Sequence, residues 1–218
     1  MKIITKKEII PIILILFSFS IGLFIYPNLP ERLPSHWNIY GEVDSWVDKN
    51  FAVFFFPCLT LFIYLLMTFL PLIDPLRENY YQFRGPYFIF RTSFVVFLTG
   101  LYLYTFWAAF NTELNINYFI LPALSLFFII IGLFLPKIKR NYFVGIRTPW
   151  TIHSEEVWDK THRFGGKVFI VVGVVALISV LMPLYSFWIF IVSALLGAFT
   201  PIVYSYIIFK KIKGFLND

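Results

Sequence analysis

Six long apolar runs constrain this chain more strongly than any other feature. They cover residues 9–26, 51–73, 87–110, 118–135, 168–184 and 187–209. A run of about 18 residues forms a helix of about 27 Å, close to the hydrocarbon thickness of a bilayer, about 30 Å. Lipid offers no partner to backbone groups, and the period-two alternation of a closed barrel is absent. The sequence therefore predicts an all-α, polytopic membrane protein with six transmembrane helices.

Composition and the ends of these runs support a membrane location. Only 14% of the 218 residues are charged, whereas soluble proteins carry roughly 25%. The single cysteine, Cys58, excludes an intramolecular disulfide. Residues 26–28 read Tyr-Pro-Asn and lack the small residues of a signal-peptide cleavage site, so we expect the first run to be a retained span. The fifth run is the weakest: only Tyr185 and Ser186 separate it from the sixth, Pro183 is expected to mark the turn, and a re-entrant hairpin is the alternative.

Basic residues are distributed unevenly between the two faces of the membrane. With six spans, both termini and the loops after the second and fourth spans share one face. Together with Arg91, near the same end of the third span, they account for every lysine and arginine except Arg32 and Lys49. This asymmetry is the positive-inside pattern. We therefore predict cytoplasmic termini, a cytoplasmic loop at 136–167 and an outer loop at 28–50. The net charge of +6 is then a membrane-surface feature, and we expect contact with membrane lipid but no direct nucleic-acid binding.

Ionisable groups are almost absent from the middle of the predicted spans. Arg91, four residues into the third span, is expected to snorkel to the cytoplasmic interface. Ion-coupled transporters usually keep ionisable groups at mid-membrane, so their scarcity disfavours a transporter.

The outer loop, residues 28–50, combines extended backbone with acidic and aromatic side chains. Pro34 favours an extended residue before it, and Gly41 supplies a turn. One interpretation is an interfacial loop held at the headgroups by its tryptophans. The other is a surface for a cationic or amphipathic peptide. The candidate ligand-facing residues are Pro34, His36, Trp37, Gly41, Asp44, Trp46 and Lys49.

A dense polar segment, "RNYFVGIRTPWTIHSEEVWDKTHRFGG", occupies residues 140–166. Ser154 is expected to cap a short helix that lies on the inner membrane surface and stops at Gly165-Gly166, with Trp158 and His162 on one face. One interpretation is membrane anchoring, with tryptophans in the headgroups and basic residues on phosphates. Docking of a protein partner is the functional interpretation that we favour. The candidate residues are Asn141, Gly145, Arg147, Thr148, Pro149, Trp150, Ser154, Trp158, Thr161, His162 and Gly165.

Chemistry at the histidines is the weaker interpretation. Conceivable metal ligands are His36 with Asp44 or Asp48, and His153 with Glu156 and His162. Neither set has a recognisable ligand spacing. An acid–base pair of His162 with Glu155 or Glu156 has no nucleophile beside it. We therefore expect no metal, no cofactor and no catalytic residue.

The polar segment strongly resembles the signature of the SdpI family of bacterial membrane proteins, in which an Asn-x-aromatic-x-Gly-Ile-Arg-Thr-Pro-Trp-Thr run precedes Ser-x-x-x-Trp-x-x-Thr-His-x-x-Gly-Gly. The matching residues are Asn141, Gly145, Ile146, Arg147, Thr148, Pro149, Trp150, Thr151, Ser154, Trp158, Thr161, His162, Gly165 and Gly166. The outer loop is similar to the small module often found ahead of that signature, and the matches there are Pro30, Pro34, His36, Gly41 and Lys49.

This resemblance implies two modules, residues 1–110 and residues 111–218, in a bacterial plasma-membrane protein. It also implies immunity to a secreted, membrane-active toxin peptide that binds at the outer loop. A second implied role is signalling, in which toxin binding leads the cytoplasmic segment to sequester a transcriptional repressor. Two alternatives remain open at this point: a small membrane transporter or exporter, and a membrane enzyme acting on lipid or cell-wall precursors through His162 and nearby carboxylates.

Overall fold

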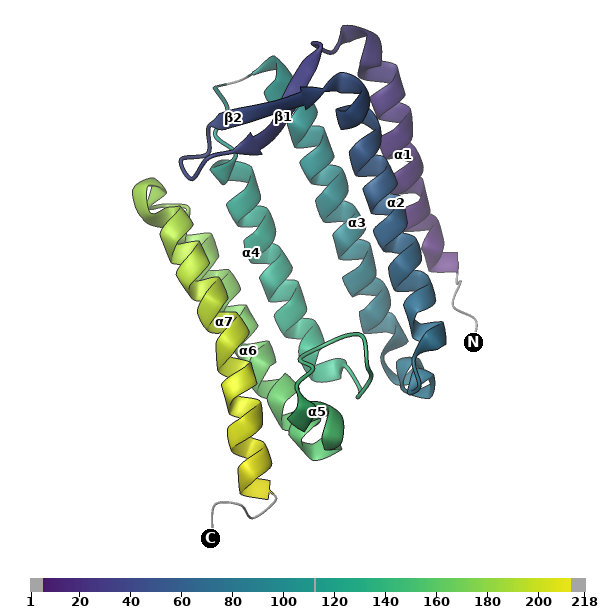
Figure 1. The fold of residues 1–218 in the computed structure, drawn as a ribbon, viewed down its shortest axis with the longest axis vertical. Coiled ribbons are helices and arrows are strands. Elements are labelled where there is room, and N and C mark those ends of the chain that lie inside the picture. The colour runs from purple at the N-terminus through teal and green to yellow at the C-terminus, as the bar shows by residue number, and fades with distance from the viewer. Residues whose placement is uncertain (1–5, 112, 213–218) are drawn as a thin grey trace. The chain divides into compact units, whose positions relative to one another are not determined.

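The computed structural model describes residues 6–111 and 113–212, and it is predominantly helical (Figure 1). Six of its helices are long and apolar enough to cross a membrane, which confirms the predicted fold class. They are α1 (Ile9–Ile25), α2 (Lys49–Ile73), α3 (Tyr80–Phe110), α4 (Asn117–Phe134), α6 (Glu155–Ser179) and α7 (Pro183–Ile212). The shorter elements include β1 (Arg32–Trp37), β2 (Val43–Asp48) and α5 (Pro149–His153), and four single-turn 3-10 helices at Lys6–Glu8, Tyr26–Asn28, Arg77–Asn79 and Leu135–Lys137.

The chain folds as two compact units that interleave along the sequence. The first contains Met1–Phe69 and Arg91–Ile120, and the second contains Leu70–Phe90 and Leu121–Asp218. Each unit has its own buried side chains and is described separately below.

In the first unit, α1 and α2 pack against the part of α3 that follows Arg91. Leu33 of β1 is fully buried in an apolar cluster with Val53 of α2 and Tyr102 of α3. The Tyr102 hydroxyl also donates a hydrogen bond of 2.8 Å to the carbonyl of Val53. The hairpin formed by β1 and β2 is thereby part of the folded core of this unit.

Arg91 is buried in an ion pair that the sequence analysis did not predict. Its side chain is only 3% exposed, and its Nη2 lies 2.6 Å from Oε1 of Glu8, which is buried to the same extent. Arg91 Nη1 also donates to the hydroxyl of Thr68 at 2.9 Å, and the Tyr64 hydroxyl donates to Glu8 at 2.9 Å. A charge in a span is costly unless paired, and here Glu8, the residue directly before α1, supplies the partner.

In the second unit, α6 runs unbroken through Gly165-Gly166, so the predicted short surface helix ending there is wrong. A Cβ at Gly166 would lie 2.7 Å from the carbonyl oxygen of Gly132 in α4. Gly166 therefore allows α6 and α4 to approach closely, because it has no side chain between the two backbones. A glycine that has this role can lie inside a continuous helix. The helix that carries the polar segment and the fifth span are one element.

The remaining span boundaries differ from the sequence analysis in two places. Helix α6 ends at Ser179, Pro183 is the first residue of α7, and Tyr185 and Ser186 belong to α7. The expected turn at Pro183 is thus present, but the separating residues precede it. Helix α3 begins at Tyr80 and is interrupted at Phe83, three residues before Pro86, because proline removes a hydrogen bond and crowds the preceding turn.

Candidate partner-binding segments

The predicted outer loop is a β-hairpin in the first unit, an element that the sequence analysis missed. Strands β1 and β2 are antiparallel, and Leu33 pairs with Val47 while Pro34 pairs with Trp46. The tip is closed by a hydrogen bond of 2.9 Å from the Asn38 N–H to the Glu42 carbonyl. Gly41 has φ +83°, a left-handed conformation that glycine adopts without strain. The sequence features that could have predicted the hairpin are two extended runs joined by a turn at Gly41.

The hairpin tip is fastened to the residues that lead into α4. The Ile116 N–H donates to the Gly41 carbonyl at 3.0 Å, and Asn115 Nδ2 donates to the Tyr40 carbonyl at 2.6 Å. A Cβ at Gly41 would collide with the Asn115 side chain. At the base, Lys49 Nζ lies 2.7 Å from Glu31 Oε1. The hairpin is therefore held at both ends, and sequence reasoning did not identify Asn115 and Ile116 as the residues that hold its tip.

The candidate outer residues divide into a supporting set and an exposed set. Pro34 is buried, Trp37 is half-buried beside the Tyr104 ring at 6.1 Å between centroids, and Gly41 and Lys49 fasten the hairpin. The exposed set contains His36, Asp44 and Trp46. His36 Nδ1 lies 2.6 Å from Asp44 Oδ1, so these two predicted site residues are neighbours.

In the second unit, Asn141 organises the start of the polar segment, residues 141–166, called the motif segment from here on. Its side chain is fully buried. Asn141 Oδ1 accepts hydrogen bonds from the N–H groups of Phe143 and Val144, at 2.9 and 2.7 Å. Its Nδ2 donates to the carbonyls of Lys139 and Val144, both at 2.9 Å. Forming all four bonds requires a side chain that both donates and accepts hydrogen bonds, and the amide of asparagine does so.

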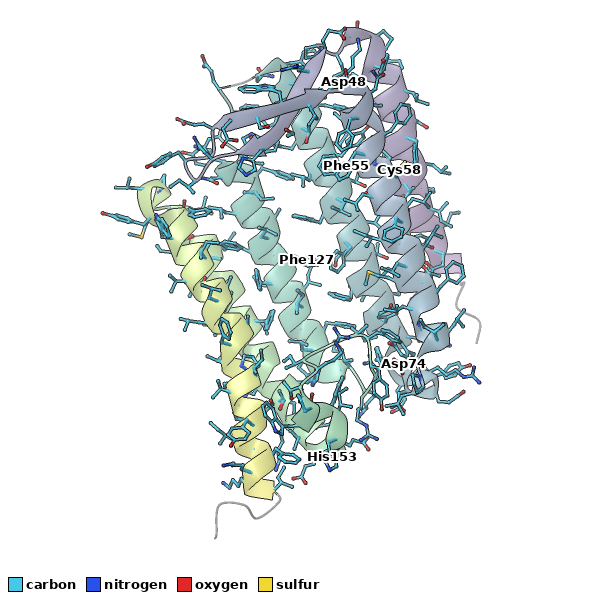
Figure 2. All side chains as sticks on the ribbon, viewed as in Figure 1. Asp48, Phe55, Cys58, Asp74, Phe127 and His153 are labelled. Atoms are coloured by element: carbon cyan, nitrogen blue, oxygen red, sulfur yellow. The ribbon has the colours of Figure 1, made fainter. Side chains whose placement is uncertain are left out.

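Asp74, which follows α2 (Figure 2), extends this network into the preceding loop. Its carboxylate accepts from the Tyr142 N–H at 2.9 Å and from the Tyr80 hydroxyl at 3.2 Å. The Tyr80 hydroxyl also lies 3.1 Å from Asn141 Oδ1. Asp74 is 2% exposed. It was not predicted as a site residue, and only its position as a lone acid directly after an apolar run could have suggested it.

His162, Trp158 and Gly145 form one packed group at the start of α6. The two rings stack with centroids 4.1 Å apart. The Ile146 N–H donates to His162 Nε2 at 3.0 Å, and His162 Nδ1 lies 2.8 Å from the Trp158 carbonyl. Nε2 is thus an acceptor and Nδ1 a donor, which is a neutral imidazole. Gly145 has φ +110°, and a Cβ there would collide with the His162 ring. His162 is a structural residue in this arrangement.

Thr148 and Ser154 are the N-caps of two successive helices, α5 and α6. Thr148 caps α5 in a reciprocal capping box with Thr151, with Pro149 in the first turn, and Thr148 Oγ1 lies 3.0 Å from Ser205 Oγ in α7. Ser154 caps α6 by accepting from the Val157 N–H, as predicted. Trp150 is half-buried against Tyr206, with centroids 5.0 Å apart.

Most of the candidate motif residues are therefore inside the fold. Asn141, Thr148, Trp158, Thr161, His162 and Gly165 are buried. Thr161 is fully buried, and its hydroxyl has no hydrogen-bond partner within residues 6–111 and 113–212. The exposed candidates are Gly145, Arg147 and Pro149. Arg147 Nη1 donates to the Tyr142 carbonyl at 2.7 Å, which orients it on the surface beside the 44% exposed Tyr142 ring.

The geometry does not support the metal-site and acid–base interpretations of the histidines. Across the part of the chain that the structure describes, no group of three or more histidine, cysteine, aspartate and glutamate side chains could hold a metal ion. His153 packs edge-on against Phe209 and His162 is buried against Trp158. Both ring nitrogens of His162 are engaged in hydrogen bonds with the backbone, at Ile146 and Trp158.

Comparisons with known proteins match both segments. Residues 137–205 match the model of the SdpI/YfhL protein family, and residues 13–61 match a domain of unknown function (DUF1648). The immunity protein SdpI of Bacillus subtilis (strain 168) is 31% identical over 210 residues, which cover 96% of this chain and 99% of that protein. No solved structure matches significantly.

Proposed function

The chain belongs to the SdpI/YfhL protein family and is a multi-pass protein of the bacterial cell membrane, and from this premise we propose that it protects its cell against a secreted, membrane-active toxin peptide. One observation carries the proposal: the similarity to an immunity protein extends over 96% of this chain and 99% of the relative. The proposed role is non-enzymatic, because immunity of this kind needs binding rather than catalysis.

We assign the toxin-facing role to the exposed part of the hairpin. His36, Asp44 and Trp46 offer acidic, titratable and aromatic contacts on a support that is fastened at both ends. A rigid support lowers the entropy that binding must offset. The charge distribution of the loops supports an outward orientation for this hairpin. The modules proposed for the two roles are residues 1–110 and residues 111–218.

A second role, retention of a cytoplasmic repressor, is supported by the exposed face of the motif segment. Arg147 is exposed and oriented by the Tyr142 carbonyl. Arg163 and Lys167 are exposed on α6 nearby in sequence. Arginine and tyrosine are enriched in protein interfaces. Signalling of this kind requires two states of the protein with different affinities for toxin and repressor.

Survival of a toxin-sensitive bacterium tests the proposal. The full-length protein is expressed, a purified SDP-like toxin peptide is added, and membrane potential and viability are followed. Wild type should protect, and His36→Ala should weaken protection. Arg147→Ala should leave protection intact and abolish repressor retention, measured by membrane fractionation. Lys160→Ala, at an exposed i,i+4 pair with Glu156, is the matched control. Absence of protection with the wild-type protein present in the membrane would refute the immunity role.

A further inference from the structure

The two edges of the hairpin differ in their ability to pair with a further strand. The sheet has two strands, so each strand has one edge that the other does not cover. On β1, Pro34 removes a donor and is buried, and the register shifts directly after it. Proline and bulges are the features that block strand addition. On β2, a second register shift leaves Asp44 without a partner residue on β1. Residues 45–48 beyond it contain neither proline nor glycine, and Ser45, Trp46 and Asp48 are exposed.

The register shows which backbone groups of β2 face its open edge. Residues opposite each other in an antiparallel pair alternate between hydrogen-bonded and non-hydrogen-bonded pairs. Counting from the hydrogen bond of the Lys49 N–H to the Glu31 carbonyl, the pair of Pro34 with Trp46 is non-hydrogen-bonded, which fits a proline without an N–H. The N–H and C=O of Trp46 therefore point away from β1. The Lys49 N–H donates to the Glu31 carbonyl at 3.0 Å. The adjacent pair, Arg32 with Asp48, is then also non-hydrogen-bonded, so the Asp48 N–H faces the same edge.

The side chains along this edge indicate the chemistry of an occupant. Trp46 is 46% exposed, and it lies between Asp44 and Asp48, both of which are exposed. Glu42 adds a carboxylate at the tip end. Arg32 of β1 lies opposite Asp48, and Lys49 pairs with Glu31, so the carboxylates of Glu42, Asp44 and Asp48 leave this edge acidic overall. An extended segment with basic side chains, and an apolar one against the Trp46 ring, is complementary to this edge.

We propose that the toxin peptide binds as a third strand along the open edge of β2, through the N–H and C=O of Trp46 and the N–H of Asp48. This inference rests on the proposed immunity function and specifies its binding mode. Backbone hydrogen bonds hold the extended peptide, and Trp46 and Asp48 select apolar and basic side chains at alternate positions. Asp44, at the register shift, adds negative charge beside them.

A scan of the peptide backbone tests this mode without altering the protein. The SDP-like toxin peptide used in the protection assay is synthesised with single N-methyl amides at successive positions. Its binding to the full-length protein in nanodiscs is then measured. Strand addition predicts losses of about tenfold at every second position of one short stretch, because alternate N–H groups face the sheet. Losses without this period, or at no position, would overturn strand addition. No binding of the unmodified peptide would refute the proposed function itself.

A pair of protein variants tests the same edge from the other side. Trp46→Pro removes the outward N–H but no bond of the hairpin, because that group does not bond to β1. Trp46→Ala removes the ring and keeps the N–H. Strand addition predicts that Trp46→Pro weakens binding about tenfold beyond Trp46→Ala. Equal affinities for the two variants, both present in the membrane, would overturn the inference and leave the immunity role standing.

Discussion

The buried Glu8–Arg91 pair should be the strongest electrostatic coupling in the first unit. Nη2 and Oε1 lie 2.6 Å apart, and both side chains are almost fully buried. At an effective dielectric constant of about 20, two unit charges at that distance attract by about 6 kcal/mol. Desolvation offsets much of this attraction, so the pair itself contributes little net stability, whereas a lone remaining charge is costly. Glu8→Gln and Arg91→Met should each lower the free energy of unfolding by about 3–5 kcal/mol.

The double variant separates this explanation from simple loss of contacts. With Glu8→Gln and Arg91→Met combined, no buried charge remains at this site, and we expect a free energy of unfolding within about 1 kcal/mol of wild type. Unfolding is followed by tryptophan fluorescence in mixed micelles with increasing dodecyl sulfate. Glu31→Gln is the matched control, because its salt bridge to Lys49 leaves the glutamate side chain 83% exposed and should change stability by less than about 1 kcal/mol. Additive losses in the double variant would refute the reasoning.

Three other positions give predictions with direct measurements. Gly166→Val should lower the thermal midpoint by an amount equivalent to about 2 kcal/mol or more, because its Cβ meets the backbone of α4; Gly85→Ala, where a Cβ meets nothing within 4 Å, is the control and should leave the midpoint nearly unchanged. Trp158→Phe should cost about 1–3 kcal/mol in chemical unfolding, because the indole N–H donates to the buried Ile138 carbonyl at 2.8 Å; an unchanged free energy would contradict that role. Gly41→Ala should cost about 1–2 kcal/mol from its positive φ alone and release the hairpin tip, which increased amide exchange at residues 38–42 would report.

Hydropathy predicted the number of spans because lipid forces every apolar run of sufficient length into a helix. It did not predict the partner of Arg91, since Glu8 lies just outside the first run and the two residues are 83 positions apart. The hairpin was missed for a similar reason. Its stability depends on Leu33 entering a cluster with α2 and α3 and on Asn115 holding the tip, and neither contact has a local signal.

The glycine pair at 165–166 illustrates how one residue type carries two opposite signals. Gly-Gly after an amphipathic stretch is typical of a helix end, and it is equally typical of close helix contact in a membrane. Only the presence of Gly132 and its carbonyl opposite Gly166 decides between them. Ser154, in contrast, was correctly predicted as a cap, because capping depends on residues within one turn.

The density of unusual residues in the motif segment has a structural explanation that changes how its variants must be interpreted. Asn141 closes a loop, Gly145 makes room for His162, and the ring of His162 accepts from the backbone of Ile146. Loss of function in a variant of these three residues therefore reports on folding, whatever partner binds outside. Arg147 is different, because its side chain is exposed and donates a hydrogen bond to the Tyr142 carbonyl. A defect of Arg147→Ala with unchanged unfolding, beside a destabilised His162→Gln, would place the partner on the surface of the segment rather than in its buried network.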